Sequence, residues 1–584
     1  MAGSRCPRTS GVPVSGRGAH SGSSVPLASL VRIDLQRKAC TVNAAKTPTA
    51  ANPPTTVDVV VVGAGFAGLY ALHKLRGEGL TVRVFEAGDG VGGVWYWNRY
   101  PGARCDVESV DYSYSFDEDL QREWDWSEKY ATQPEILRYV NHVADRFDLR
   151  RDIEFGTRVT DVVLDEPAMR WEIRTEAGDV LSARFCVLAV GPLSNANVPA
   201  IEGLESFEGG LYHTAHWPHE GIDFTGMRVG VIGTGSSGIQ TIPRIAEQAA
   251  QLHVFQRTPN YSVPAGNVPL GDADRAEQKA NYTERRRLSM AGGGGSPHEP
   301  HPKSALEVSE EERRAAYEKR WQLGGVLFSK TFPDQLLTIE ANDTARLFWE
   351  DKVRVVIDDP EVADLLIPKD HPIGTKRICT DDKYFQTFNR ENVKLVDLRA
   401  APIERIDSAG VHTTDKHYAL DALVLATGFD AMTGSVEKMN IVGRGGRTLN
   451  QEWAEGPKTY LGLGIAGFPN LFNLTGPGSP SVLANMVLHS ELHVNWVAGA
   501  IGYLDAHGAV ALEARRDAVA DWVEECADRA AATLMLHANS WHVGANIPGK
   551  PRVFMPFVGG FGVYGEIIAE VAAAGYKGFD VIEG

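Results

Sequence analysis

A glycine-rich motif that occurs twice, each time between an apolar, valine-containing segment and a helical pattern, sets the strongest limit on the fold. In the first copy, the valines at 59–62 predict a strand buried on both faces. Leucines at helical spacing follow, and a second apolar run lies at 82–85. The same order returns at 227–257, in MRVGVIGTGSSGIQTIPRIAEQAAQLHVFQR. Each copy predicts a βαβ unit, so the expected fold class is α/β with two Rossmann-like dinucleotide-binding domains.

The first copy has the spacing G-x-G-x-x-G at Gly63, Gly65 and Gly68. The first two glycines allow a tight turn and close approach of the backbone to a pyrophosphate, and the third lets the helix pack on the strand. Glu86 closes the second strand, where a carboxylate accepts hydrogen bonds from the hydroxyls of an unphosphorylated ribose. This copy predicts an FAD site, and a glycine turn without a ligand is the alternative.

The second copy repeats the three glycines with two serines between them: Gly233, Gly235, Ser236, Ser237 and Gly238. At the position equivalent to Glu86 it has Gln256, followed by Arg257 and Thr258. A 2′-phosphate is repelled by an acid but is held by a guanidinium and a hydroxyl, so this copy predicts an NADPH site. Arg257 as a surface charge at a strand end is the alternative. FAD in the first site and NADPH in the second predict a flavin enzyme that accepts hydride.

Composition narrows the partners of such an enzyme. The 584 residues include 58 Lys and Arg against 75 Asp and Glu, and the net charge of −17 argues against nucleic acid or an anionic membrane as a partner. The six cysteines include no C-x-x-C pair, so neither a structural zinc site nor a redox dithiol is expected. His213 and His216 lack a third ligand at a metal-site spacing, so no metal is expected. We expect a cytoplasmic protein, with the oligomeric state left open and a monomer favoured.

The length predicts more than one domain. Residues 1–54 are rich in Ser, Gly, Pro and Arg, so we expect a disordered extension, either an over-extended start or a transit peptide. The remaining chain is divided into a first part of the FAD-binding domain at 55–190, an NADP-binding domain at 191–265 and 373–400, a helical insertion at 266–372, and a second part of the FAD-binding domain with the C-terminal segment at 401–584. The apolar run at 419–430 is expected to be a strand that closes the first sheet.

Two further strings carry a resemblance to a known family. The first, G-G-x-W-x-x-x-x-Y-P-G-x-x-x-D, has its defining residues at Gly92, Gly93, Trp95, Tyr100, Pro101, Gly102 and Asp106. The second, F-x-G-x-x-x-H-x-x-x-W-P, has them at Phe207, Gly209, His213, Trp217 and Pro218. Together with the two glycine motifs they resemble the type I Baeyer-Villiger monooxygenases, from about Val57 to the C-terminus. GPGSPSVLANM and similar strings look closest to the branch that acts on steroids and phenylacetone.

The resemblance implies an enzyme that uses NADPH and O2 to insert one oxygen atom beside a ketone carbonyl, through a peroxide on C4a of the flavin. It places the catalytic arginine at Arg377, the NADP-contacting lysine at Lys376, and a carboxylate beside the arginine at Asp106. A guanidinium suits this role because it keeps its charge beside a developing anion. Without the resemblance, these residues are interpreted as a solvated basic pair and a turn residue.

The same resemblance implies further positions. Trp541 matches a tryptophan on a loop that folds over NADP, and a substrate-pocket bulge matches Ser481, Val482, Leu483 and Met486. Their alternatives are a surface aromatic residue and ordinary core residues. His213 is interpreted as structural. The expected substrates are O2 and a bulky ketone, a steroid 20-ketone such as progesterone or an aryl ketone. An N- or S-oxidising flavin monooxygenase and a flavoprotein that transfers electrons without oxygenating are the alternatives.

Overall fold

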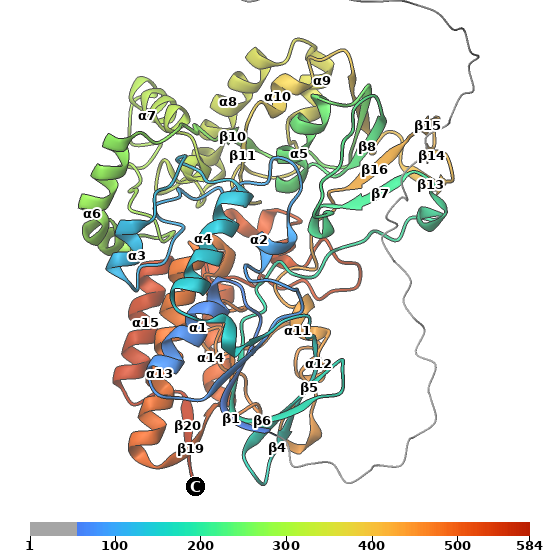
Figure 1. Ribbon diagram of the computed structural model, residues 1–584. Helices are drawn as coiled ribbons and strands as arrows, with labels where there is room; N and C mark the ends of the chain where they lie inside the picture. The colour runs from blue at the N-terminus through green and yellow to red at the C-terminus, as the bar shows by residue number, and fades with distance from the viewer. Residues whose placement is uncertain (1–54) are drawn as a thin grey trace, which may run out of the picture.

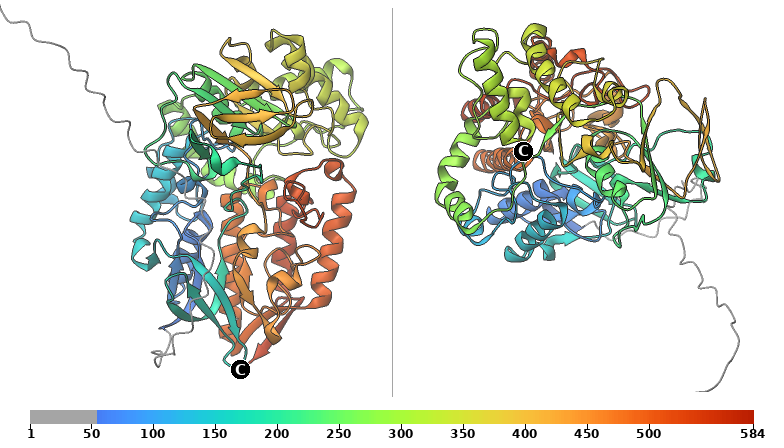
Figure 2. Two further views of the ribbon diagram at one scale, coloured as in Figure 1. Left: turned by 90° about the vertical axis from the view of Figure 1, so that its right-hand side faces the viewer. Right: turned by 90° about the horizontal axis from the view of Figure 1, so that it is seen from above.

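The computed structural model describes residues 55–584, so the extension expected at 1–54 lies outside the described residues. Two sheets carry the two glycine motifs, and helices from distant parts of the chain surround them (Figure 1). The C-terminal helices lie beside the N-terminal helix α1, while the second sheet and the helices of 266–372 form the other half of the molecule (Figure 2). The predicted α/β class with two dinucleotide-binding units is confirmed.

The first sheet has eight strands in the order β17-β4-β5-β6-β1-β2-β3, with β18 paired to β6. Their bounds are β1 (Thr55–Val62), β2 (Val82–Phe85), β3 (Ile153–Glu154), β4 (Val159–Asp165), β5 (Arg170–Thr175), β6 (Val180–Leu188), β17 (Asn440–Val442) and β18 (Leu471–Asn473). β1 pairs in parallel with both β2 and β6, and helix α1 (Phe66–Gly77) connects β1 to β2. Segments from the last third of the chain therefore complete the sheet that the first glycine motif opens.

The second sheet has five parallel strands in the order β12-β9-β8-β16-β7. Its elements are β7 (Gly210–His213), β8 (Arg228–Ile232), helix α5 (Ser236–Ala246), β9 (Gln251–Gln256), β12 (Val393–Asp397) and β16 (Ala422–Leu425). A small antiparallel sheet lies between β12 and β16 in the chain: β13 (Ile403–Asp407), β14 (Gly410–Thr413) and β15 (His417–Ala419).

The placement of β16 corrects one prediction, because the run at 419–430 was expected to close the first sheet. β16 instead lies between β8 and β7 in the second sheet. A Cβ added to Gly63 would lie 2.7 Å from the carbonyl oxygen of Ala189, directly after β6, and one added to Gly233 would lie 2.4 Å from that of Ala426, directly after β16. β16 thus supports the second glycine turn as β6 supports the first. A short run buried on both faces fits either sheet, so the sequence could not choose between them. The other predicted domain bounds stay a prediction.

The segment 266–372 is helical, as α6 (Asp272–Ala291), α7 (Glu310–Leu323), the 3-10 turn η4 (Val326–Lys330), α8 (Ile339–Val356) and α9 (Pro360–Leu366). The two short strands that flank it, β10 (Ser262–Pro264) and β11 (Cys379–Asp381), pair in parallel. The chain therefore leaves and re-enters the second unit at one place. Trp349 of α8 donates its indole N–H to the carbonyl of Ser262 at 2.6 Å and packs against Tyr261, so the segment shares the core of the second sheet.

The C-terminal region consists of helices α13 (Met486–His507), α14 (Arg516–Ala531) and α15 (Phe561–Ala573) with strands β19 (Ala509–Ala514) and β20 (Phe579–Glu583). α13 is mostly buried and packs with α1 against the first sheet, where Tyr70 donates to Asn495 at 2.8 Å. The remaining α-helices of the described chain are α2 (Val94–Trp97), α3 (Glu118–Glu123), α4 (Gln133–Arg146), α10 (Tyr384–Thr387), α11 (Gly434–Glu437) and α12 (Leu449–Glu452). Among residues 55–584, no helix has the length and apolar character needed to cross a membrane.

Candidate functional site

The first glycine turn leaves bare backbone where a dinucleotide can approach. A Cβ added to Gly68 would lie 1.8 Å from the carbonyl oxygen of Gly63, so this glycine allows α1 to pack on β1. Gly65 faces Gly93, whose added Cβ would lie 3.0 Å from the Cα of Gly65. Gly93 has a φ of +55° and precedes α2, in which Trp95 donates its indole N–H to the hydroxyl of Tyr112 at 3.1 Å. The two predicted motifs therefore meet at one turn.

Glu86 directly follows β2, and its side chain reaches the same glycine turn. Its carboxylate oxygens accept hydrogen bonds from the backbone N–H groups of Ala64 and Gly88, both at 2.8 Å. Burial raises the pKa of Glu86, and the two backbone donors oppose that shift. A buried carboxylate beside a glycine turn at a helix N-terminus has the donor and acceptor set that an FAD ribose and pyrophosphate need, so these residues fit FAD.

The string from Gly93 to Asp106 joins the two units. Tyr100 donates its hydroxyl to the side chain of Gln240 in α5 at 2.9 Å. A Cβ added to Gly102 would lie 2.3 Å from the carbonyl oxygen of the same Gln240, so only a glycine permits this contact. The string thus runs from the first glycine turn to the helix of the second motif, which explains its glycine-rich and aromatic composition.

Arg377 lies where this string ends. Its Nε donates to Asp106 Oδ2 at 2.9 Å and its Nη2 to Asp106 Oδ1 at 2.8 Å, a bidentate pair, while Nη1 donates to the Val482 carbonyl at 2.7 Å. The negative charge of Asp106 is the main cause that raises the pKa of Arg377. Two residues further on, Cys379 Sγ lies 3.1 Å from Ser236 Oγ at the start of α5. Arg377 is therefore a permanently charged group between the two glycine motifs.

In the second glycine turn, Gly235 has free space around it and Gly238 does not. A Cβ added to Gly238 would lie 2.2 Å from the carbonyl oxygen of Gly233, whereas Gly235 has no atom within 4 Å of such a Cβ. Gly235 therefore stays open to close approach by a phosphate, and Gly238 packs helix on strand. The other predicted residues of this site surround the turn: Ser236 and Ser237 at the start of α5, and Thr258 after β9.

Three cations gather beside this turn, one of which the sequence analysis missed. Burial lowers the pKa of Lys376, and the negative charge of Asp370 raises it. The positive charges of Arg257 and Arg399 lower the pKa of Lys376 further, so both arginines lie near Lys376. Arg399 follows β12, the neighbour of β9, and is bonded to Asp370 at 2.7 Å. The carboxyl ends of neighbouring parallel strands meet at one edge, so Arg399 could have been found only from the strand order, which the sequence does not give. The open glycine and the three cations fit the phosphates of NADP.

An apolar cluster lies against the Val482 side of Arg377. It consists of Leu193, Ala431, Met432, Val482, Met486, Trp541 and Met555. Three of the predicted pocket and loop residues, Val482, Met486 and Trp541, are thus brought together. Met432 and Met555 are buried, whereas Leu193, Met486 and Trp541 are only partly buried and form an apolar wall. An unbranched methionine adapts to irregular ligand shapes, so this wall suits a bulky apolar molecule.

The two other predicted pocket residues are placed differently. Leu483 packs in a neighbouring cluster with Phe554 and Val558. Ser481 is fully buried, and its hydroxyl donates to the carbonyl of Thr475 at 2.8 Å, so it braces the turn before Val482.

The second fingerprint string lies at the connections between the sheets. His213 Nδ1 accepts from the N–H of Ala215 at 3.0 Å, and Nε2 lies 3.3 Å from the Asn197 carbonyl and 3.2 Å from the Thr427 hydroxyl. Burial lowers the pKa of His213 to about 4, so the ring is neutral at physiological pH. Asn197 follows β6 and Thr427 follows β16, so His213 contacts both segments that cross between the two sheets. Of the other residues of the string, Trp217 packs against Tyr212 of β7 and Phe207 lies in the cluster that contacts Leu211 of β7. Gly209 directly precedes β7, and Pro218 follows Trp217.

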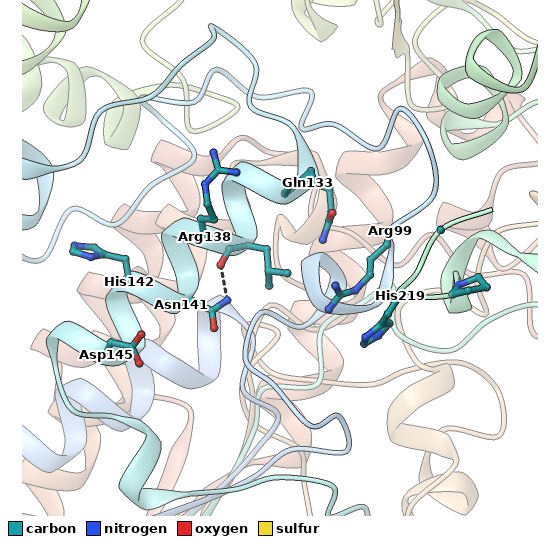
Figure 3. Close-up of a pocket in the computed structure, with 11 residues that line it drawn as sticks. Arg99, Gln133, Arg138, Asn141, His142, Asp145 and His219 are labelled. Atoms are coloured by element: carbon teal, nitrogen blue, oxygen red, sulfur yellow. Dashed lines mark hydrogen bonds between the residues drawn. The ribbon is translucent and has the colours of Figure 1, made fainter. Parts of the chain in front are cut away.

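Two further features lie apart from Arg377. A groove of about 730 Å³ lies on the face of α4. Figure 3 shows Arg138, Asn141 and His142 on one side of it and Arg99 and His219 on the other. Of the predicted site residues only Pro218 lines it, so the groove is separate from the candidate site.

The small antiparallel sheet carries a possible group of metal ligands, Asp407, His412 and His417. Asp407 is already bonded to His412 and to the N–H groups of Ala409 and Gly410. We interpret this group as a set of hydrogen bonds that closes a turn.

Comparison with known proteins extends this picture. Residues 56–264 match the family described as flavin-binding monooxygenase-like. A Baeyer-Villiger monooxygenase of Pseudooceanicola batsensis is 42% identical, over 89% of this chain and 95% of its own length. The phenazine N-monooxygenase PhzNO1 of Lysobacter antibioticus is also 42% identical, over 90% and 97%.

Solved structures agree with these relatives. A structure of an oxidised steroid monooxygenase bound to NADP is 72% identical and has a TM-score of 0.88, covering 91% of this chain and all of that one. Another solved relative, 40% identical, holds both FAD and NADP. These proteins are similar along nearly the whole described chain.

Proposed function

This chain belongs to the type I Baeyer-Villiger monooxygenases, flavin-binding and NADPH-dependent enzymes, and we propose that it converts a bulky ketone, a steroid 20-ketone first, to an ester. FAD and NADP are its cofactors. Bound FAD, reduced by NADPH, supplies the activation of O2. The remaining steps depend on side chains of this chain.

The arrangement of Arg377 is the observation that carries the proposal. Attack on a ketone carbonyl places negative charge on its oxygen, and a fixed cation aimed at that oxygen lowers the barrier. A guanidinium has five N–H donors, and three of those of Arg377 are bonded to Asp106 and Val482. Two donors therefore remain for the reacting oxygen, and the raised pKa keeps the charge in place throughout.

The preference for a bulky ketone is supported by the wall beside Val482. Met486 and Trp541 are its partly buried members, an unbranched and an aromatic apolar side chain, and such side chains select a ligand by shape and burial. The 72% identical structure is that of a steroid monooxygenase, which favours a steroid over a small cyclic ketone. Arg257, Lys376 and Arg399 would hold the phosphate that distinguishes NADPH from NADH.

The test is product analysis. The FAD-loaded protein is incubated with NADPH, ¹⁸O2 and progesterone, with phenylacetone and cyclohexanone in parallel. We expect an acetate ester of the steroid that carries one ¹⁸O atom, formed fastest from the steroid. NADPH oxidation without any labelled ester from all three ketones contradicts the proposal.

N-oxidation is the second candidate, because the 42% identical relative from Lysobacter antibioticus is a phenazine N-monooxygenase. Arg377 stabilises charge on a carbonyl oxygen, and an amine or phenazine nitrogen has no such oxygen. Phenazine in the same assay separates the two: a labelled N-oxide with no labelled ester would favour this second candidate.

A further inference from the structure

A buried polar network lies behind the turn that carries Val482, and the reaction as described leaves it unused. His489 and His493 lie one turn apart on α13, are fully buried, and have their Nε2 atoms 3.0 Å apart. The Nε2 of His493 also lies 2.6 Å from the hydroxyl of Tyr564 on α15. On the opposite side of the ring, the backbone N–H of Thr475 donates to His493 Nδ1 at 3.0 Å. His493 therefore links α15 to the start of the turn.

The hydrogen-bond partners of His493 determine which of its ring nitrogens carries the proton. A backbone N–H can only donate, so Nδ1 of His493 must be the unprotonated nitrogen and Nε2 must carry the hydrogen. The Tyr564 hydroxyl donates to the carbonyl of Leu461, so its oxygen is free to accept from that Nε2–H. Burial also lowers the pKa of His493 well below its usual value, which keeps the ring neutral. The network therefore holds one tautomer, with its acceptor aimed at Thr475.

The turn that begins at Thr475 has a backbone that needs support. Thr475 has a φ of +54° and Ser481 a φ of +43°, in the left-handed region that residues other than glycine seldom adopt. Such conformations persist only where their surroundings determine them, and they concentrate at functional sites. Thr475 is held twice, by His493 at its N–H and by the Ser481 hydroxyl at its carbonyl. Val482 directly follows Ser481, so its position depends on both of these hydrogen bonds to Thr475.

Val482 in turn orients Arg377. Its carbonyl accepts from Nη1 at 2.7 Å, and the other two bonds of the guanidinium go to Asp106. The Asp106 carboxylate fixes the edge formed by Nε and Nη2, and the Val482 carbonyl fixes Nη1. We propose that His493 is a positioning residue for Arg377, which it orients through Thr475 and the carbonyl of Val482. This inference rests on the proposed function of Arg377.

Two substitutions at one position separate positioning from general packing. In His493→Asn the side-chain oxygen takes the place of Nδ1 and still accepts from Thr475, but the contact with Tyr564 is lost. In His493→Gln the side-chain end takes the place of Nε2 and keeps the contact with Tyr564, but the Thr475 N–H has no acceptor. Both remove the same buried ring, so a merely structural role lowers thermal stability to a similar extent in both.

The first readout is hydrogen exchange of a peptide covering 471–485, which needs no turnover. We expect the Thr475 amide to exchange at least about tenfold faster in His493→Gln and within about twofold of the wild type in His493→Asn. The second readout is ester formed per NADPH consumed, which we expect to fall at least about threefold in His493→Gln only, with the KM for NADPH unchanged. Ser481→Ala removes the other support of Thr475 without touching α13, and it should lower the same ratio.

His253→Gln is the matched control, because His253 is also buried but lies on β9 without a bond to this turn. It should leave both readouts unchanged. Equal ratios of ester to NADPH in the Asn and Gln variants, or faster exchange at Thr475 with a wild-type ratio, overturn the proposal. A wild-type protein that forms no ester contradicts the proposed function instead, and the exchange data still report whether His493 holds the turn.

Discussion

Removal of Arg257 tests whether the three cations beside the second glycine turn select NADPH. In Arg257→Ala the site loses one full positive charge from an exposed position at the end of β9. A unit charge about 4 Å from a phosphate of charge −2 contributes roughly 2 kcal/mol in a water-like dielectric, which is about 30-fold in Kd. NADH lacks the 2′-phosphate, so its Kd should change less than about twofold.

The surroundings of Lys376 and Arg399 predict how much each contributes to NADPH binding relative to Arg257. Lys376 is half-buried, so its charge is screened less and Lys376→Ala should weaken NADPH at least as much as Arg257→Ala. Arg399 is bonded to Asp370 at 2.7 Å, so its charge is partly neutralised and its loss should cost only a few-fold. Arg228 is the control, because it lies at the opposite end of the same sheet, paired with Asp421.

The assay is titration of the FAD-loaded variants with NADP and NAD at low and high salt. We expect added salt to weaken NADP binding, and to do so less in Arg257→Ala. An equal loss of affinity for both dinucleotides, or no salt dependence, would refute the assignment of these cations to the 2′-phosphate.

Three other outcomes follow from the same structure. Gly238→Ala should lower the thermal unfolding temperature because its Cβ meets a carbonyl at 2.2 Å, whereas Gly235→Ala should leave that temperature unchanged and raise the KM for NADPH. Asp106→Asn removes the charged partner of Arg377, so ester formation should fall about 10- to 100-fold in steady-state product assays while NADP still binds. Burial lowers the pKa of His253 to about 4, so the unfolded state binds an extra proton between pH 6.5 and 4. The free energy of unfolding of the wild type should therefore fall between pH 7 and pH 4 as this proton binds. In His253→Gln that fall should be smaller, by up to roughly 3 kcal/mol. Equal melting of the two glycine variants, a wild-type rate for Asp106→Asn, or parallel pH curves would each count against the matching argument.

The sequence predicted those parts of the fold and site that depend on local spacing. Each G-x-G-x-x-G needs a strand before it and a helix after it, so both βαβ units could be placed from the residues alone. Asp106 and Arg377 are 271 residues apart, and their bonding could be expected only from the family resemblance. A strand buried on both faces, such as β16, has the same apolar pattern in either of the two large sheets, so the sequence could not show which sheet it joins.

Residues that act through tertiary contacts gave no local signal. Arg399 has no motif and joins the phosphate site only because β12 lies beside β9. His493 looks like any polar residue in a buried helix until Thr475 and Tyr564 are seen on either side of its ring. The inward turn of the Ser481 hydroxyl depends on a positive φ, which the sequence SPSVL does not reveal.

The role of Arg377 is tested most directly by comparing Arg377→Met with the wild type in a single experiment. Both proteins, loaded with FAD, are given NADPH, ¹⁸O2 and progesterone, and the NADPH consumed and the ¹⁸O-labelled ester formed are counted together. We predict that the wild type forms nearly one ester per NADPH, whereas the variant still consumes NADPH and forms at least about 100-fold less ester. Labelled ester from Arg377→Met at the wild-type rate would contradict the account.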